Sequence, residues 1–127
     1  MSIGDIASDA RGTGARFNSG KPPMELIPII GLESAALVFG YGAEKYAAWN
    51  WAKGMPWSAV VGCMMRHLAA IQRGEDLDPE SGLPHVGHLM CNALMLATFR
   101  ETFPEGNDYG TPHLARPVPA KAAAAEQ

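Results

Sequence analysis

Proline and glycine residues divide the middle of the chain into segments whose apolar residues recur with the period of an α-helix. The first segment opens near Pro28, a favourable residue in a first helical turn, and continues to about Tyr46. Gly40 and Gly42 weaken its middle, where the helix can break. No segment alternates as a half-buried strand would. The pattern therefore predicts an all-α fold.

The second and third helical segments have clearer boundaries. Ser58 is the expected N-cap of the second, which continues through Arg73 and stops at Gly74. The third covers residues 84–103 and is ended by the proline that follows. Between the first and second helices, the loop AWNWAKGMPW contains three tryptophans, which must pack on a neighbouring surface.

The predicted helices define one domain, residues 20–104, between a Gly- and Ser-rich segment at 1–19 and a Pro- and Ala-rich segment at 105–127. We expect both flanking segments to be flexible tails. Three helices in about 85 residues bury little apolar surface, and two of them have apolar residues on more than one face. We therefore expect a homodimer or homotetramer in which helices of several subunits complete a bundle.

Charge and hydropathy exclude several classes of protein. Ten basic residues stand against thirteen acidic ones, with no run of Lys or Arg to hold a nucleic-acid polymer. The N-terminal sequence lacks the apolar core of a signal peptide, and no apolar run reaches the ~20 residues of a membrane span. We expect a cytoplasmic protein, in which Cys63 and Cys91 are buried free thiols.

Histidines occur on inward-facing positions of the second and third helices. His85, His88 and Asn92 share one face of the third helix. His67 lies on the apolar face of the second, so its imidazole is expected inside the bundle, where it needs a partner. A lone helical histidine is more often a hydrogen-bonded core residue than a ligand.

An acidic connector between these two helices supplies four carboxylates, those of Glu75, Asp76, Asp78 and Glu80. Such connectors are usually just solvated. This one adjoins paired histidines, and carboxylates with imidazoles suit Mg²⁺, Mn²⁺ or Zn²⁺, so a site for a metal or for phosphate chemistry is as readily predicted as a solvated connector. Glu44 in the first helix is another candidate ligand. Glu33 lies about 16 Å from it along a straight helix, so at most one of the two belongs to the site.

Basic, amide and aromatic side chains are the candidates for substrate contact. Lys21 and Lys45 are as readily phosphate ligands as solvated surface charges. Arg66 adjoins the inward-facing histidine of the second helix, so its planar guanidinium can reach a phosphate at the mouth of the bundle. Trp51, with Asn50 beside it, can contact a base or sugar, although core packing is the commoner role of a tryptophan.

Six short blocks, in order, give the chain a family resemblance. They are GKPP, LIP, YGAEKY, NWAKGMPWS, MRHLAA and GEDLDPESGLPHVGHLMCN, and they span about residues 18–100. Their order and spacing resemble the phage dATP/dGTP diphosphohydrolases, the MazZ-type relatives of the MazG all-α pyrophosphohydrolases. The resemblance implies a MazG-like helical oligomer in the host cytoplasm and a divalent ion such as Mg²⁺ or Mn²⁺. It also implies cleavage of a deoxypurine triphosphate, dGTP or dATP, to the monophosphate and pyrophosphate, with dGMP supplying synthesis of a modified purine nucleotide.

The chain departs from the wider superfamily at the metal ligands. MazG-like enzymes hold their ions with an ExxE motif on one helix and an ExxD motif on the next, whereas His85 and His88 occupy the corresponding second pair here. Either these histidines replace carboxylates as ligands, or Glu75, Asp78 and Glu80 bind the ions while the histidines orient them.

The expected mechanism is in-line attack of an activated water on a triphosphate bridged by one or two divalent ions. The candidate metal ligands are Glu44, Glu75, Asp78, His85 and His88. The candidate catalytic residues are His67, as a general base or as the holder of a ligand, and Glu80. The candidate substrate-binding residues are Lys21, Lys45, Asn50, Trp51, Arg66 and Asn92.

Two other functions fit part of the pattern. The histidine-rich helices suggest a histidine/aspartate-type phosphohydrolase, which releases triphosphate and a nucleoside, but the chain has no adjacent His-Asp pair. A non-catalytic helical module with a structural metal would also account for the acidic connector and the histidines. Product analysis separates the first from a diphosphohydrolase, and turnover separates the second.

Overall fold

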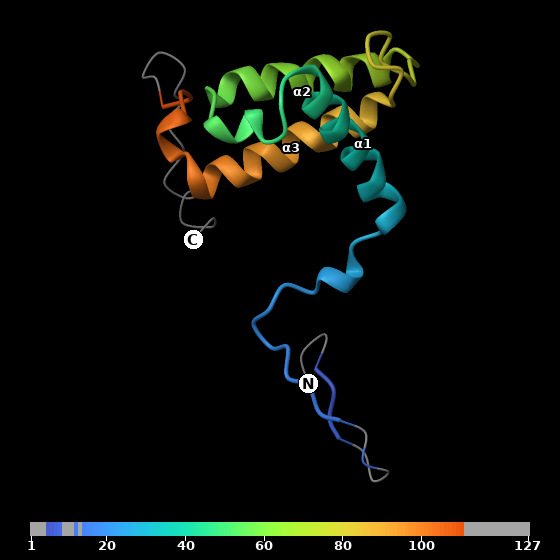
Figure 1. The fold of residues 1–127 in the computed structure, drawn as a ribbon, viewed down its shortest axis with the longest axis vertical. Helices are drawn as coiled ribbons and strands as arrows, with labels where there is room; N and C mark the ends of the chain where they lie inside the picture. Colours follow the sequence, from blue (N-terminus) through green and yellow to red (C-terminus); the bar gives the residue numbers. More distant parts are fainter. Residues whose placement is uncertain (1–4, 9–11, 13, 111–127) are drawn as a thin grey trace, which may run out of the picture. The chain divides into compact units, whose positions relative to one another are not determined.

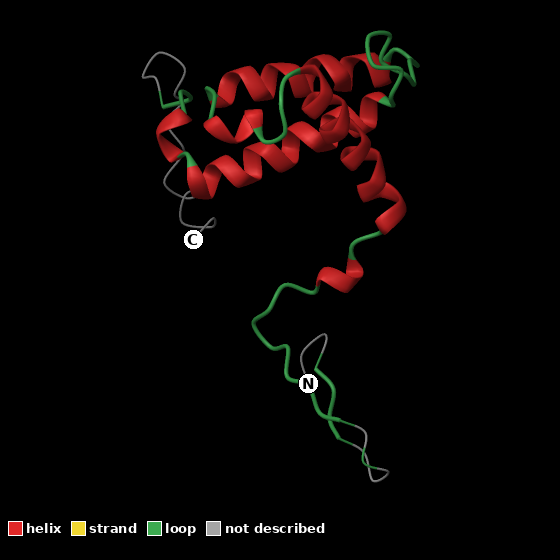
Figure 2. Ribbon diagram, viewed as in Figure 1, coloured by secondary structure: helices red, strands yellow, loops and turns green. Residues whose placement is uncertain are grey.

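The computed structural model describes residues 5–8, 12 and 14–110. These residues form three α-helices, three short 3-10 helices and two isolated β-bridges, with no strand among them (Figure 2). The all-α fold class is therefore confirmed. None of the helices in this part of the chain is long and apolar enough to cross a membrane. The remaining positions all belong to the predicted terminal tails and lie outside the described residues.

The chain divides into two units, Met1–Glu33 and Ser34–Gln127. The described part of the first unit contains an antiparallel bridge between Ile6 and Arg16 and the 3-10 helix η1 (Met24–Leu26). Most of the helical structure, and all of the candidate site described below, belongs to the second unit.

Helix α1 (Ile29–Lys45) begins directly after Pro28, as predicted. It continues without a break through Gly40 and Gly42, so the break that these glycines allow does not occur. The helical hydrogen bonds persist to the end of the helix, where the amide of Tyr46 donates to the carbonyl of Gly42 (2.9 Å). Both glycines line a pocket, where the lack of a side chain leaves open space.

Helices α2 (Trp57–Gln72) and α3 (His85–Thr102) form an antiparallel hairpin and lie side by side along their length (Figure 1). The largest fully buried side chains in the described structure belong to this pair, namely Val60 of α2 and Cys91 and Phe99 of α3. Removal of such side chains from water is the main favourable term in folding. The hairpin is therefore the core of the second unit.

The two ends of α2 differ in how well the sequence predicted them. Gly74 adopts φ +88 directly after the helix, a conformation that glycine reaches without strain, so the predicted stop is confirmed. Ser58 as N-cap is wrong, because α2 begins one residue earlier, at Trp57, after Pro56. The amide of Ser58 lies inside the first turn and donates to Oδ1 of Asp108 (3.0 Å), whose carboxylate caps the helix from outside the predicted domain.

The tryptophan loop packs onto the hairpin through two of its three tryptophans. It contains the 3-10 helix η2 (Asn50–Lys53). The ring of Trp51 lies between Phe39 of α1 and Phe99 of α3, at centroid distances of 5.7 and 5.8 Å. Nε1 of Trp57 donates to the carbonyl of Phe103 (3.1 Å). The expectation that this loop packs on a neighbouring surface is confirmed.

Both cysteines are free, as predicted. Cys91 is buried, and burial raises the pKa of its thiol to about 11, with Cys63 acting in the same direction. Cys63 is only half-buried and, like Cys91, belongs to the wall of the pocket. A thiol with so high a pKa is almost entirely protonated at neutral pH and is a poor nucleophile.

Candidate functional site

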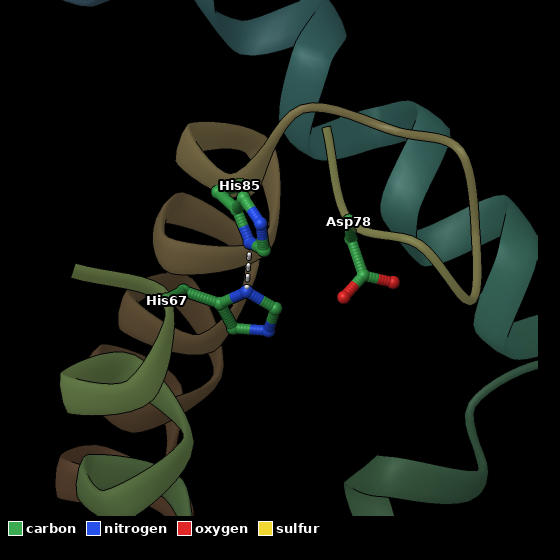
Figure 3. A group of neighbouring side chains, drawn as sticks. All are labelled: His67, Asp78 and His85. Carbon is green, nitrogen blue, oxygen red and sulfur yellow. Dashed lines mark hydrogen bonds between the residues drawn. The ribbon is translucent and has the colours of Figure 1, made fainter. Parts of the chain in front are cut away.

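The acidic connector folds into a closed loop whose two ends meet. The amide of Asp78 donates to the carbonyl of Leu83 (2.8 Å), and the amide of His85 donates to the carbonyl of Asp76 (2.8 Å). A turn between these pairs includes Gly82 at φ +71, where glycine adopts the left-handed conformation without strain. The loop thereby brings the Asp78 side chain beside the start of α3 (Figure 3).

Three side chains from three segments converge at this point: His67 from α2, Asp78 from the connector and His85 from the start of α3 (Figure 3). Nδ1 of His67 and Nδ1 of His85 are 2.9 Å apart. One potential ligand atom from each of the three residues lies within 4.8 Å of the other two. Since His85 is buried and His67 is half-buried against it, the prediction that His67 faces into the bundle is confirmed.

His88 adjoins this group and connects to it through Ser81. The His88 ring stacks on that of His67, with centroids 4.5 Å apart and an interplanar angle of 11°. Its Nε2 lies 2.6 Å from the Ser81 hydroxyl, which in turn donates to Oδ2 of Asp78 (3.0 Å). The amide of Ser81 donates to the same oxygen (2.9 Å). Ser81 therefore joins a buried imidazole to a carboxylate of the connector.

Burial and hydrogen bonding set the charge of these groups. Burial lowers the pKa of His67, and His88 and His85 lower it further. Burial also lowers the pKa of His88. For Asp78, burial acts to raise the pKa, but hydrogen bonds from Ser81 outweigh it and the pKa is lowered. At neutral pH the rings of His67 and His88 are therefore uncharged beside an ionised Asp78.

A pocket of about 630 Å³ adjoins the histidine group. Polar side chains of its wall include His67, Asp78, Glu80, His88 and Asn92. Aromatic side chains of its wall are Phe39, Tyr41, Tyr46, Trp49 and Trp51. Pockets of roughly 300–1,000 Å³ with apolar walls and a few converging polar groups are typical of small-molecule sites.

Trp49 and Trp51 have different surroundings although both line the pocket. Trp51 is packed between two phenylalanines, whereas Trp49 is 72% exposed and contacts the Trp51 ring at a centroid distance of 5.9 Å. Trp49 also has φ +65, which no other non-glycine residue in the described structure shares. Such a backbone conformation is uncommon for a bulky residue and is maintained by its surroundings. Trp49 therefore presents most of its ring to solvent at the edge of the pocket.

Lys45 and Glu80, predicted separately as a phosphate ligand and a catalytic group, form an ion pair with each other. Nζ of Lys45 lies 2.5 Å from Oε1 of Glu80, joining the end of α1 to the connector. The hydrogen bond from Lys45, followed by one from Tyr41, lowers the pKa of Glu80, and the same pair raises the pKa of Lys45. Both side chains are exposed, so the pair is accessible to a charged ligand.

Other predicted residues lie at varying distances from this group. Asn50 and Asn92 line the pocket, and the Asn92 amide donates to the carbonyl of a neighbouring histidine (2.8 Å). Glu75 forms an exposed ion pair with the arginine two residues before it (2.8 Å). Glu44 and Arg66 are exposed and do not line the pocket. Lys21 is exposed in the first unit.

Two residues of the site, Ser81 and Tyr41, were not predicted from the sequence, and Trp51 rather than Trp49 was selected from the tryptophans as the contact to the base. The spacing of Asp78 and Ser81 is typical of a turn in which an aspartate side chain accepts from the backbone three residues on, which was a usable signal. Tyr41 is four residues before Lys45 and so shares its helix face, and this spacing was a second usable signal. No local pattern distinguishes Trp49 from its neighbouring tryptophan, since only packing does so.

Comparison with known proteins identifies the family to which this chain belongs. Residues 11–109, which include every candidate site residue, match the family model described as dATP/dGTP diphosphohydrolase, N-terminal. The chain is 29% identical over 96 residues to the dATP/dGTP diphosphohydrolase of Salmonella phage PMBT28. That stretch is 76% of this chain but 33% of the relative, so the chain spans about one third of the relative's length. No solved structure matches the chain.

Proposed function

Because the chain belongs to the family of dATP/dGTP diphosphohydrolase N-terminal regions, we propose that its pocket binds a deoxypurine nucleoside triphosphate and hydrolyses it to the monophosphate and pyrophosphate. The observation that supports this most strongly is the presence of an aromatic wall and a His/Asp group in one pocket. A nucleotide requires both kinds of surface, since its base stacks on aromatic rings and its phosphates need positive charge, which a divalent ion held by the His/Asp group would supply. In this proposal dGTP is the preferred substrate and dATP the second.

The aromatic wall is the proposed site of the base. The exposed ring of Trp49 offers a face for stacking, while Trp51 behind it is held by the core. Asn50, next to both, has an amide that can donate to and accept from the edge of a purine. The pocket volume of about 630 Å³ is sufficient for a nucleotide.

Lys45 and Glu80 are the proposed phosphate ligand and proton acceptor. A triphosphate has more negative charge than one carboxylate, so it competes with Glu80 for the Lys45 ammonium. Loss of that hydrogen bond removes the main cause of the low pKa of Glu80. The released carboxylate then becomes a better acceptor for the proton of an attacking water.

The residues around Asp78 fit a divalent cation, for which Mg²⁺ and Mn²⁺ are the expected choices. Within residues 14–110, the hydrogen bonds of the Asp78 carboxylate all end on Oδ2, which leaves Oδ1 available beside the imidazoles. When bound, a divalent ion lowers the pKa of a coordinated water and offsets charge on the phosphates. Asp78 and His85 would hold it, and the neutral ring of His67 is suited either to accept a proton or to act as a ligand.

In this proposal the protein acts in the cytoplasm of a host cell as a homo-oligomer, and its product dGMP supplies synthesis of a modified purine nucleotide. Exposed apolar side chains in the second unit support oligomerisation, since Leu37, Met65 and Leu68 are each more than half exposed. Light scattering at micromolar concentration should therefore give a mass of at least two chains. A stable monomer of 13.5 kDa would contradict this part of the proposal.

The activity is tested with each deoxynucleoside and ribonucleoside triphosphate in the presence of Mg²⁺ or Mn²⁺, followed by chromatography of the products. We expect a purine monophosphate and pyrophosphate, fastest with dGTP, and no activity after chelation of the metal. Release of triphosphate and a nucleoside would instead indicate a histidine/aspartate-type phosphohydrolase. If the protein turns over no nucleotide, the remaining candidate function is a non-catalytic helical module with a structural metal.

A further inference from the structure

The group formed by His67, Asp78 and His85 has the composition of a mixed nitrogen and oxygen ligand set. Each residue comes from a different segment, and one donor atom of each lies within 4.8 Å of the other two (Figure 3). The fold therefore already brings the three donors near one another before any ion binds.

The two imidazoles are close enough to each other to bind one ion together. Nδ1 of His67 and Nδ1 of His85 are 2.9 Å apart. This contact is a hydrogen bond, so one of the two nitrogens holds a proton, which a bound ion would displace.

His88 is engaged elsewhere and is a positioning residue. The Ser81 hydroxyl donates its one proton to Asp78, so it accepts from Nε2 of His88, which lies 2.6 Å away. A protonated Nε2 cannot bind an ion, and His88 is not among the residues whose donor atoms lie together. His88 therefore fixes Ser81, and through it the direction of the Asp78 carboxylate.

We propose that His67, Asp78 and His85 are the ligands of a first-row transition ion of the Mn²⁺ to Zn²⁺ series, bound in preference to Mg²⁺. Mg²⁺ selects oxygen ligands, whereas imidazole suits the transition ions, and two of the three donors here are imidazoles. This inference deepens the proposed function by identifying the ion class and by making His67 a ligand. The test measures ion binding without substrate, so its outcome does not depend on hydrolysis.

The test uses the full chain, without a histidine tag and stripped of metal by a chelator, titrated with Co²⁺. We expect one equivalent of Co²⁺ to give the ligand-field absorption of a nitrogen- and oxygen-bound ion. Zn²⁺ should displace it at a comparable concentration, Mn²⁺ should displace it only in excess because it binds such sites more weakly than Co²⁺, and Mg²⁺ in roughly 100-fold excess should not. Absence of a Co²⁺ spectrum, or its loss on addition of Mg²⁺, would overturn the proposal.

Four variants, each checked for helical circular dichroism, assign the ligands. His67→Gln and His85→Gln should each weaken Co²⁺ binding by more than about 100-fold, and His88→Gln by about tenfold with a shifted spectrum at unchanged stoichiometry. Glu101→Gln, in an exposed ion pair outside the group, is the control and should bind as the parent does. Wild-type affinity in His67→Gln would overturn the proposal. Should that variant not fold, Asp78→Asn, which keeps the shape of the side chain, gives the same test.

The two proposals fail in different ways. If the protein binds Co²⁺ or Zn²⁺ through His67 but has no hydrolytic activity, the proposed metal site is supported and the proposed function is excluded. If Mg²⁺ alone supports hydrolysis of dGTP and the protein binds no transition ion, the proposed function is supported and the proposed metal site is excluded.

Discussion

The aromatic wall and the side chains of His67, Asp78 and His88 line the same pocket, but different forces hold them in place. Trp51 is held by contact with Phe39 and Phe99, so its position depends on apolar burial, which has no preferred direction. Asp78 and His88 are held by Ser81 through hydrogen bonds, which act only at particular distances and angles.

This difference separates stability from activity within one pocket. A substitution of Trp51 in the aromatic wall removes packing from the core and should lower the free energy of unfolding. A substitution that preserves shape in the histidine group removes a charge or a hydrogen bond at the surface of the pocket, and should act mainly on turnover.

Trp51→Ala should cost on the order of 3 kcal/mol of unfolding free energy, the low end of the usual range for a core tryptophan, because the side chain is only half-buried. Trp49→Ala should cost less than about 1 kcal/mol, since its ring is 72% exposed, but should raise KM for the nucleotide. Urea unfolding followed by circular dichroism measures the first, and steady-state kinetics the second. If Trp51→Ala and Trp49→Ala lose the same unfolding free energy, the packing energy belongs to the loop as a whole and not to Trp51 in particular.

Asp78→Asn should lower kcat by about 100-fold or more at saturating metal, because it keeps the shape of the side chain and removes the negative charge next to the imidazoles. Glu75→Gln removes a charge from the same connector outside the group and should have kcat near that of the parent. Circular dichroism confirms that both variants are folded. Near-parental turnover in a folded Asp78→Asn protein would show that this carboxylate takes no part in the reaction.

The helices were predictable because their boundaries are local. Gly74 ends α2 and Pro84 precedes α3, and each acts through its own backbone preference. The cap of α2 was not predictable in this way. Ser58 and its partner Asp108 are separated by 50 residues, so only the folded chain shows that a distant carboxylate does the capping.

The inward direction of His67 was predictable because helical periodicity determines which face of α2 is buried. Its pairing with His85 depends on how α2 and α3 align, and the role of Ser81 depends on closure of the connector loop. The ion pair of Lys45 with Glu80, separated by 35 residues, has the same origin. The residue types of the site were therefore readable from the sequence, whereas their partners were not.

Gly87→Ala should test the contact that joins the two regions, because α1 supplies part of the aromatic wall and α3 supplies two histidines. A Cβ at Gly87 would lie 2.6 Å from Oγ and 2.8 Å from the carbonyl oxygen of Ser34, so α1 must move away from α3. We expect a loss of about 1–3 kcal/mol in unfolding free energy. Gly40→Ala, with nothing within 4 Å of its Cβ position, should instead stabilise α1 by up to about 1 kcal/mol. A Gly87→Ala protein as stable as the parent would show that the helices do not press on each other here.

Lys45→Ala should have the smallest effect, about a tenfold rise in KM for the nucleotide with a lesser change in kcat, if the ammonium contacts a phosphate equally in the ground and transition states. Lys53→Ala removes an exposed lysine that does not line the pocket and should change neither constant. Glu80→Gln completes the comparison. If Glu80 competes with the phosphate for Lys45, this variant should lower KM, and if the released carboxylate accepts a proton, it should also lower kcat. A fall in kcat with KM unchanged would retain Glu80 as the proton acceptor but remove its competition with the substrate, because an ion pair that does not oppose binding leaves substrate affinity as it was.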